Sequence, residues 1–308
     1  MSSMDDFRAL AAKVRNWGRW GDDDQLGTLN FIDAAARLRA AACVQDGKVF
    51  SLAIPLSVEG PQIGIIPGRE NPVLNVFAID EENITPEGFG FSDDSIAMGT
   101  QACTHWDGLC HASYDDLLYN GYPTSSITSE GTAKNGIEHA AQVLVTRGVL
   151  VDLARQQGVD MVEPGYAITG DDLDAACASA GVTVEPGDAI LIRTGKMARF
   201  LAGDKMGYAM GAAGPSLESV EWFHDHSVAA VATDTMTFEV FPCERDDFQL
   251  PIHFLHIVDM GLTQGQNWNL EELAADCAAD GRSTFLLSAP PEPITGGIGA
   301  PVNPMAVK

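Results

Sequence analysis

Four side chains able to bind a metal ion lie within residues 100–111, which read TQACTHWDGLCH. They are Gln101, His105, Asp107 and His111. Because side chains two positions apart face the same way in an extended segment, we expect His105 and Asp107 to converge, with Gln101 and His111 in the same phase. Imidazole nitrogens combined with carboxylate and amide oxygens suit Zn²⁺ or Mn²⁺ better than soft metals. The spacing alone leaves two interpretations open: a metal centre, or histidines that cluster by chance.

Other polar groups favour structural roles. His224 and His226 form an HDH pair at the end of a helical run, where solvated side chains are favoured over a second metal pair. Asp234 follows an apolar strand, and a buried carboxylate is costly unless it is hydrogen-bonded, so we expect it to accept bonds from backbone amides. Neither the dinucleotide fingerprint G-x-G-x-x-G nor the nucleophile elbow G-x-S-x-G occurs in the chain. Nucleotide binding and serine hydrolysis are therefore not supported.

Alternating apolar runs and helical patterns surround the motif. Near-continuous apolar strands are predicted at 148–153, 189–195 and 228–234, with shorter strands at 49–56 and 74–79. Helices are predicted at 4–16, 34–43, 171–180 and 216–226, the second of them capped by Asp33. Stretches rich in Gly, Pro and acidic residues predict loops at 17–31 and 80–90 and an irregular tail over 289–307. Strands this apolar indicate a sheet covered on both faces, and hence an α/β fold.

The 308 residues are long enough for one large domain, and no low-complexity linker divides them. We expect a single domain over 1–308, with 1–48 as an N-terminal helical and loop extension packed on it. Eighteen basic against 43 acidic residues give a formal net charge of −25. Such a surface repels phosphate backbones, so nucleic acid and membranes are not expected partners. The beginning of the chain lacks the pattern of a signal peptide, and the six scattered cysteines form no CxxC pair, which predicts a cytoplasmic protein.

The motif resembles the H-x-G-T-H-x-D-x-P-x-H signature of the cyclase-like metal-dependent hydrolases, which include bacterial kynurenine formamidase and isatin hydrolase. Further segments are similar to the family in the same order, covering the chain from about residue 50 to its end. They are RGVLVDLA (147–154), VEPGDAILIRTG (184–195), GPSLESVEWFHDHSVAAVATDT (214–235) and GGIGAPVNPMAV (296–307). The N-terminal WGRWGDDDQLGTLNF looks like the longer "cyclase family protein" branch. The resemblance implies a swivelling β/β/α type of fold, with a mixed, partly barrel-like sheet core flanked by helices.

The resemblance also implies roles for particular residues. His105 and Asp107 would be metal ligands, with Gln101 standing at the position of the first family histidine, and His111 would act in catalysis. Cys103 and Leu109 replace the Gly and the Pro of the signature.

A second family element, a His followed by a Glu, is matched by His253 and by Gln266, which replaces the Glu. These two residues are expected to orient the substrate carbonyl. Loss of that carboxylate favours one Mn²⁺ or Zn²⁺ per chain over two. His256 is a neighbouring alternative to His253, because their spacing suits a helix.

Three functions stay open at this point. The first is a metal-dependent hydrolase that acts on a C–N or C–O bond of a small cyclic or aromatic amide, lactam, lactone or ester. The second is a metal-dependent lyase, dehydratase or cyclase acting on a small carbonyl compound. The third is a small-molecule binding protein with a decayed metal site, for which Gln101 and Gln266 are the only signs. The family resemblance also implies a homodimer or homotetramer.

Overall fold

Three apolar runs of the sequence lie side by side at the centre of one mixed sheet. The computed structural model describes residues 4–78, 85–245, 247 and 249–308. In it the strands β7 (Val145–Asp152), β9 (Ala189–Arg193) and β11 (Ala230–Thr233) are parallel neighbours. The described strands of this sheet follow the order β1-β15-β13-β7-β9-β11-β12-β4-β14. β12 (Thr263–Gln266) extends the parallel set.

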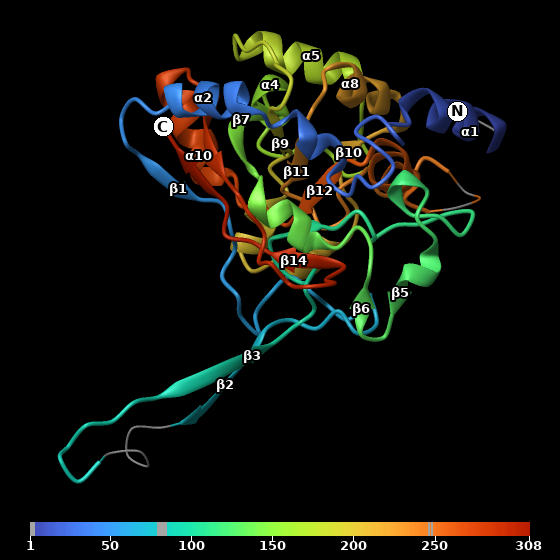
Figure 1. The fold of residues 1–308 in the computed structure, drawn as a ribbon. Helices are drawn as coiled ribbons and strands as arrows, with labels where there is room; N and C mark the ends of the chain where they lie inside the picture. The colour runs from blue at the N-terminus through green and yellow to red at the C-terminus, as the bar shows by residue number, and fades with distance from the viewer. Residues whose placement is uncertain (1–3, 79–84, 246, 248) are drawn as a thin grey trace.

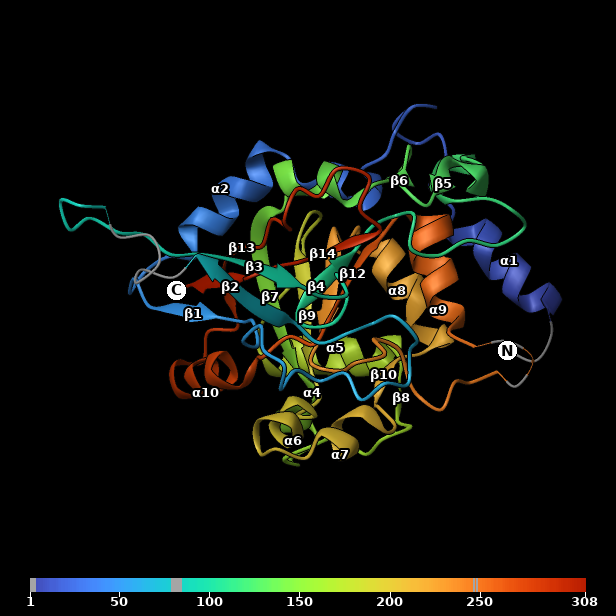
Figure 2. The same cartoon turned by 90° about the horizontal axis from the view of Figure 1, so that it is seen from below.

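Both edges of the sheet are built from antiparallel pairs. On one side lie β13 (Thr284–Ser288), β15 (Met305–Val307) and β1 (Val49–Ser51), and on the other β4 (His105–Asp107) and β14 (Gly299–Pro301). The sheet curls into a half-barrel with helices around it (Figure 1, Figure 2). The predicted α/β fold with a mixed, partly barrel-like sheet flanked by helices is confirmed.

Alternating residues of the central strands enter two different cores. Val149, Ile190 and Val231 pack in the core beneath α5 and α8, whereas Leu150 and Leu191 pack in a second core on the other face. The expected burial of both faces is therefore confirmed, because residues of opposite phase on one strand are equally inaccessible to water.

The helices begin and end largely where the sequence pattern placed them. α1 buries one face, made by Phe7, Leu10, Ala11 and Val14, and the side chain of Asp33 caps α2 by accepting from the backbone N–H of Ala36. The α-helices are α1 (Met4–Val14), α2 (Ala34–Ala42), α4 (Leu153–Gln156), α5 (Gly170–Ser179), α6 (Met197–Leu201), α7 (Lys205–Ala209), α8 (Val220–Asp225), α9 (Pro251–His253) and α10 (Glu271–Asp280). The 3-10 helices are η1 (Gly27–Phe31), η2 (Tyr119–Gly121), η3 (Thr124–Ser126), η4 (Ile137–Gln142) and η5 (Leu217–Ser219), and η6 (Phe254–Met260) is a π-helix.

The segment that follows α1 is tied to η6 by hydrogen bonds. Asn16 donates from its side chain to the carbonyl of Met260, and Trp17 donates to that of Val258. Arg15 forms an ion pair with the buried Asp259. These contacts hold residues 15–17 against η6, which directly follows α9, the helix that carries His253.

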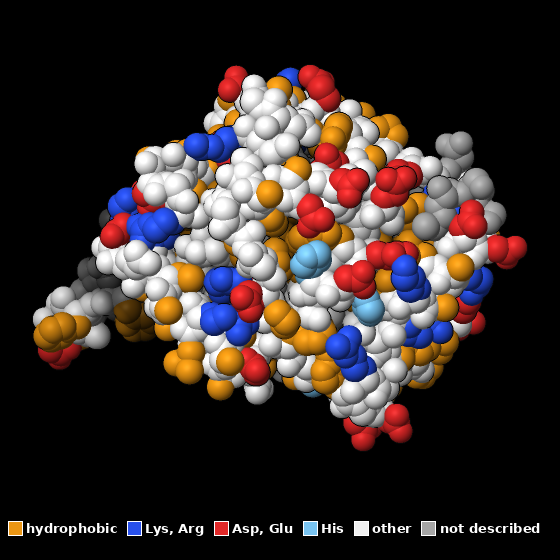
Figure 3. Space-filling model, turned by 90° about the horizontal axis from the view of Figure 1, so that it is seen from above, with side chains coloured by type: hydrophobic (Ala, Val, Ile, Leu, Met, Phe, Trp, Pro, Cys, Tyr) orange, Lys and Arg blue, Asp and Glu red, His pale blue; other side chains and the backbone are white. Residues whose placement is uncertain are grey.

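Two small ribbons and one long one lie outside the main sheet. The small ones pair β8 (Ala167–Ile168) with β10 (Gly214–Pro215) and β5 (Ile127–Thr128) with β6 (Gly131–Thr132). β2 (Val73–Ala78) and β3 (Asp93–Ala97) form an antiparallel hairpin that projects from the body as an arm (Figure 1). Within the described residues, no helix is long and apolar enough to cross a membrane. Acidic and basic side chains are interspersed over the helix-covered face (Figure 3).

Four expectations need correction or fall partly outside the described chain. The tail expected to be irregular contains β14, which forms one edge of the sheet, and β15, which lies between β13 and the other edge strand, β1. The strand expected over 49–56 ends at Ser51, and Gly27–Phe31 forms a helical turn inside the predicted loop. Residues 79–84, which end the predicted 74–79 strand and begin the predicted 80–90 loop, lie outside the described residues.

Candidate metal centre

The strands β4, β12 and β14 place the predicted ligands on one face of the sheet. Gln266 is paired with His105 across the β12–β4 ladder, and Gly299 of β14 is paired with Asp107. Paired residues and residues two apart share a face, so His105, Asp107 and Gln266 point the same way. Trp106 points into the opposite core, where its ring meets Trp268 edge-on at 4.8 Å. The predicted convergence of His105 and Asp107 is confirmed, and Trp106 packs the motif against the core.

A turn then brings His111 back to the same place. The chain bends at Gly108, whose carbonyl accepts from the backbone N–H of His111. A Cβ at Gly108 would lie 2.9 Å from the carbonyl oxygen of Ile298, so only glycine fits between β4 and the segment that leads into β14. His111 Nε2 lies 3.8 Å from Asp107 Oδ1, and its side chain is 22% exposed.

The atoms that could bind a metal lie around one carboxylate oxygen, Asp107 Oδ1. His105 Nδ1 donates to the carbonyl of Cys103 at 2.7 Å, which leaves its Nε2 unprotonated and 3.5 Å from Asp107 Oδ1. The amide of Gln266 donates to the other oxygen, Asp107 Oδ2, at 2.7 Å. Asp107 Oδ1 is buried and accepts no hydrogen bond from any described residue. A buried carboxylate oxygen without a donor is costly, and a cation among these atoms would satisfy it.

The electrostatics keep this carboxylate ionised. Burial alone would raise the pKa of Asp107, but the nearby His111 and His105 rings outweigh that effect and hold the pKa well below its usual range. Burial lowers the pKa of His111, and attraction to Asp107 offsets this only in part. At neutral pH the centre therefore presents an anionic carboxylate, the protonation state in which this group binds a metal.

The residues fit a divalent ion, although they do not form a complete cage. Among the described residues, no cluster of three or more His, Cys, Asp or Glu side chains is by itself sufficient to hold a metal. Three atoms could bind one ion together. Asp107 Oδ1 has no hydrogen-bond donor, and both His105 Nε2 and His111 Nε2 lie within 4 Å of it. Such a site would have positions open for solvent or substrate, as catalytic sites do and closed structural sites do not.

Gln101 lies beside this set without joining it. Its carbonyl oxygen accepts from the Thr100 hydroxyl at 2.9 Å, and its Nε2 lies 2.7 Å from where a Cβ at Gly299 would be. Because Gly299 has no side chain, the Gln101 amide can occupy the space beside it, and Gly299 is paired with Asp107. Gln101 is not among the described residues that line the adjoining cavity, so its coordination of a metal stays a prediction.

The cavity adjoining the centre has a volume of about 350 Å³. Asp107, His111, Gln266 and His253 lie at its polar end. The remaining walls are mainly apolar and come from four loops and helices: Ile63, Ile65, Ile66, Ala209, Met210, Met236, Phe241 and Leu250. A largely apolar pocket with a few convergent polar groups is typical of small-molecule sites.

His253 reaches the polar end of the cavity from a different part of the fold. It belongs to α9, not to a strand, and its ring centre lies 6.3 Å from that of His111. His253 Nδ1 donates to Glu239 Oε1 at 2.6 Å, and the backbone N–H groups of Ile252 and His253 donate to the same carboxylate. Glu239 therefore fixes the ring so that the hydrogen is on Nδ1 and Nε2 is free to accept a proton.

The remaining candidates have structural roles. His256 is fully buried between the edges of Phe223 and Phe238, and burial lowers its pKa to about 3, so it stays neutral. Asp234 accepts from the backbone N–H groups of Thr194 and Gly195 and from the Thr194 hydroxyl, which confirms the predicted cap.

Neither the HDH pair nor the nearby thiols belong to the centre. His226 stacks on Trp222 at 4.3 Å, and His224 contacts Asp225 at the half-exposed end of α8. Burial raises the pKa of the Cys103 and Cys110 thiols to about 11 and about 12, which disfavours the thiolate form that binds metals.

A family profile described as "Putative cyclase" matches residues 50–240. The chain belongs to the cyclase family. A solved structure described as a novel cyclase is 39% identical, with a TM-score of 0.88, and the match covers 97% of this chain and 99% of that one. This cyclase-family chain also resembles isatin hydrolase A from Ralstonia solanacearum, at 21% identity and a TM-score of 0.62, over 89% and 95% of the two chains. A predicted metal-dependent hydrolase from Bacillus stearothermophilus is 16% identical, with a TM-score of 0.56, over 85% and 98%. No curated protein matches the chain.

Two residues of this cyclase-family protein escaped the sequence argument: Glu239, which holds the cavity residue His253, and Arg69, which lines the cavity itself. Glu239 stands alone in the apolar run TFEVF, and an isolated acid among buried residues is the signal that could have found it. Arg69 reaches the cavity from an irregular loop, and nothing in its local sequence sets it apart.

Proposed function

We propose that this protein is a metal-dependent hydrolase that cleaves a C–N or C–O bond in a small cyclic or aromatic amide, lactam, lactone or ester, as a kynurenine formamidase-like enzyme would. The observation that carries the proposal is the unsatisfied Asp107 Oδ1 facing His105 Nε2 and His111 Nε2 at the polar end of an apolar cavity. Isatin hydrolases and a predicted metal-dependent hydrolase share the fold and support the same reaction class. A cytoplasmic enzyme with one Mn²⁺ or Zn²⁺ per chain is part of this proposal.

A divalent cation bound there would supply Lewis acidity, lowering the pKa of a water ligand and polarising a substrate carbonyl. His105 and Asp107 would hold it, with Gln266 fixing Asp107 through Oδ2. His111 lies within reach to accept a proton from the attacking water. It would return that proton to the leaving nitrogen or oxygen as the C–N or C–O bond breaks.

His253 supplies a second proton acceptor at the polar end of the cavity. Its tautomer is set by Glu239, so its Nε2 can accept a hydrogen bond from the attacking water or from the acid product. The apolar walls exclude bulk water from the carbonyl and bind the body of the substrate.

Elemental analysis of the wild type beside Asp107→Ala tests the proposal. We expect about one equivalent of Mn or Zn per chain in the wild type and none in the variant, with the same far-ultraviolet circular dichroism spectrum for both. Equal metal content in the two proteins would remove Asp107 from the ligand set. No metal in either protein after incubation with Mn²⁺ and Zn²⁺ would favour the binding-protein alternative.

Product analysis in ¹⁸O-labelled water separates hydrolysis from the lyase or cyclase reaction. Only hydrolysis incorporates solvent oxygen into the acid product, so unlabelled product from an active protein would contradict the hydrolase assignment.

A further inference from the structure

Arg69 lines the cavity and brings a positive charge to an otherwise apolar wall. Its backbone is held in place on both sides. Arg69 N donates to the carbonyl of Ile66 across the Pro67–Gly68 turn, and Gly99 N donates to the carbonyl of the next residue, Glu70. The Gln62 side chain anchors the same loop by donating to the carbonyl of Ala102, just before the metal motif. The guanidinium is therefore presented by an ordered loop tied to the residues that precede His105.

Among the described residues, no carboxylate forms an ion pair with Arg69. The other charged or titratable groups at the polar end have partners: Asp107 contacts His105 and Gln266, and Glu239 accepts from His253. Arg69 is the arginine among the described cavity-lining residues, so its free N–H groups face the site. Burial lowers the pKa of Arg69, and Asp107 offsets that only in part, yet a guanidinium stays charged at any physiological pH.

Asp107 is near enough to raise the pKa of Arg69 but forms no direct ion pair with it, so the guanidinium N–H groups that face the apolar cavity are free to bind an anionic ligand. Guanidinium geometry matches a carboxylate through two parallel hydrogen bonds. The neighbouring side chains of Ile63, Ile66 and Phe241 form an apolar wall that suits the aromatic or aliphatic part of a ligand.

We infer that Arg69 binds a carboxylate that the substrate already carries, remote from the reacting carbonyl, so that the substrate class is an anionic, partly aromatic amide, lactam, lactone or ester. This inference rests on the proposed function for the identity of the reacting bond. The carboxylate site itself depends only on Arg69 and the cavity.

The test uses benzoate and its neutral isostere benzamide as probes, with calorimetric titration of each protein as purified. In the wild type we expect benzoate to bind about tenfold more tightly than benzamide, the size of one charge-assisted hydrogen-bonded pair. Arg69→Gln should lose that preference, and Arg69→Lys should keep part of it. Arg8→Gln is the matched control, because Arg8 is exposed and pairs with Asp115 on the surface.

The same titrations in Asp107→Ala separate the two proposals. If the anion preference survives there, it belongs to Arg69 whether or not a metal binds. A benzoate preference that persists in Arg69→Gln, or no benzoate binding to the wild type at millimolar concentration, would overturn the inference. Modification by phenylglyoxal with peptide mapping needs no variant: benzoate should protect Arg69 and benzamide should not, and equal modification with both probes would contradict the site.

Discussion

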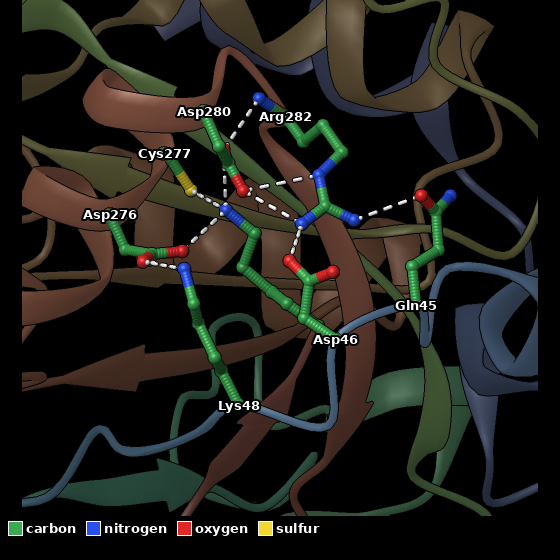
Figure 4. Close-up of polar contacts among 8 residues, drawn as sticks. Gln45, Asp46, Lys48, Asp276, Cys277, Asp280 and Arg282 are labelled. Carbon is green, nitrogen blue, oxygen red and sulfur yellow. Dashed lines mark hydrogen bonds and ion pairs between the residues drawn. The ribbon is translucent and has the colours of Figure 1, made fainter.

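The cavity around Asp107 and the charge cluster around Lys308 both remove ionic groups from water, but they satisfy them differently. Lys308 is fully buried and donates to Asp276 and Asp280 at 2.9 Å each. Lys48 fills the other oxygen of Asp276, and Arg282 fills the other oxygen of Asp280 while also reaching Gln45 and Asp46 (Figure 4). In contrast, Asp107 has one oxygen bonded to Gln266 and one with no donor.

The difference separates a structural cluster from a binding centre. Each oxygen of the two carboxylates that face Lys308 has a partner within the chain, so an added ligand has nothing to satisfy. At Asp107 the chain leaves one strong acceptor and two imidazole nitrogens without complementary groups, which lowers stability unless a cation or substrate supplies them. We therefore expect substitutions in the first region to change stability and those in the second to change binding and turnover.

The largest effect is expected for His111→Ala. Metal content should stay near that of the wild type, while turnover falls by roughly 10²- to 10⁴-fold, the usual contribution of a general acid–base residue. The measurement is kcat beside elemental analysis, with His224→Ala as the control histidine outside the cavity. Full activity in His111→Ala would remove His111 from the reaction.

A smaller loss is expected for Glu239→Gln, because Glu239 acts through His253. The amide can no longer accept from both the ring and two backbone N–H groups, so the ring loses its fixed tautomer. Turnover should fall by roughly 10- to 100-fold without loss of metal, as for other partners of active-site histidines.

The ¹⁵N chemical shifts of the His253 ring provide the readout that a purely structural change would not move. They should show a mixture of tautomers in Glu239→Gln and a single one in Glu244→Gln, a control acid that accepts only from the backbone of Leu217. An unchanged tautomer in Glu239→Gln would show that Glu239 does not position the ring.

Much of the centre followed from the sequence because it lies on one strand. His105, Asp107 and Trp106 alternate on β4, and the period of a strand alone assigns their faces. The partners that come from other loops could not be found this way. Only the fold brings Glu239 to His253 and Arg69 to the cavity.

The strands of the sheet likewise divide into those that the sequence predicted and those that it did not. The apolar strands β7, β9 and β11 were visible as runs of buried residues. The short strands β14, at one edge of the sheet, and β15, next to the other edge strand, were missed, because their pairing with β4 and β13 stabilises residues that have little strand propensity of their own.

The third prediction concerns the charge cluster around Lys308. Lys308→Met should lower the free energy of unfolding by about 1–2 kcal/mol, below the usual cost of breaking a buried ion pair, because Lys48 and Arg282 still pair with the two acids. Metal content and turnover should not change. Urea denaturation measures the loss, and a variant as stable as the wild type would show that the cluster contributes no net stability.

The smallest expected effect is the pH dependence of the difference in unfolding free energy between the wild type and Lys308→Met. Hydrogen bonds from Lys48 and Lys308 lower the pKa of Asp276. Burial raises the pKa of Asp280, but bonds from Lys308 and Arg282 outweigh it and lower the pKa overall. A depressed acid pKa contributes stability above the unfolded value of 3.8 and loses it as pH falls through the folded value. The stability gap between wild type and Lys308→Met should therefore stay the same from pH 7 to about pH 4 and narrow at lower pH, as the two acids of the folded protein become protonated, in urea titrations that extend to about pH 2. A gap of constant size would mean that Lys308 stabilises the fold by packing its methylene chain, and not by its charge.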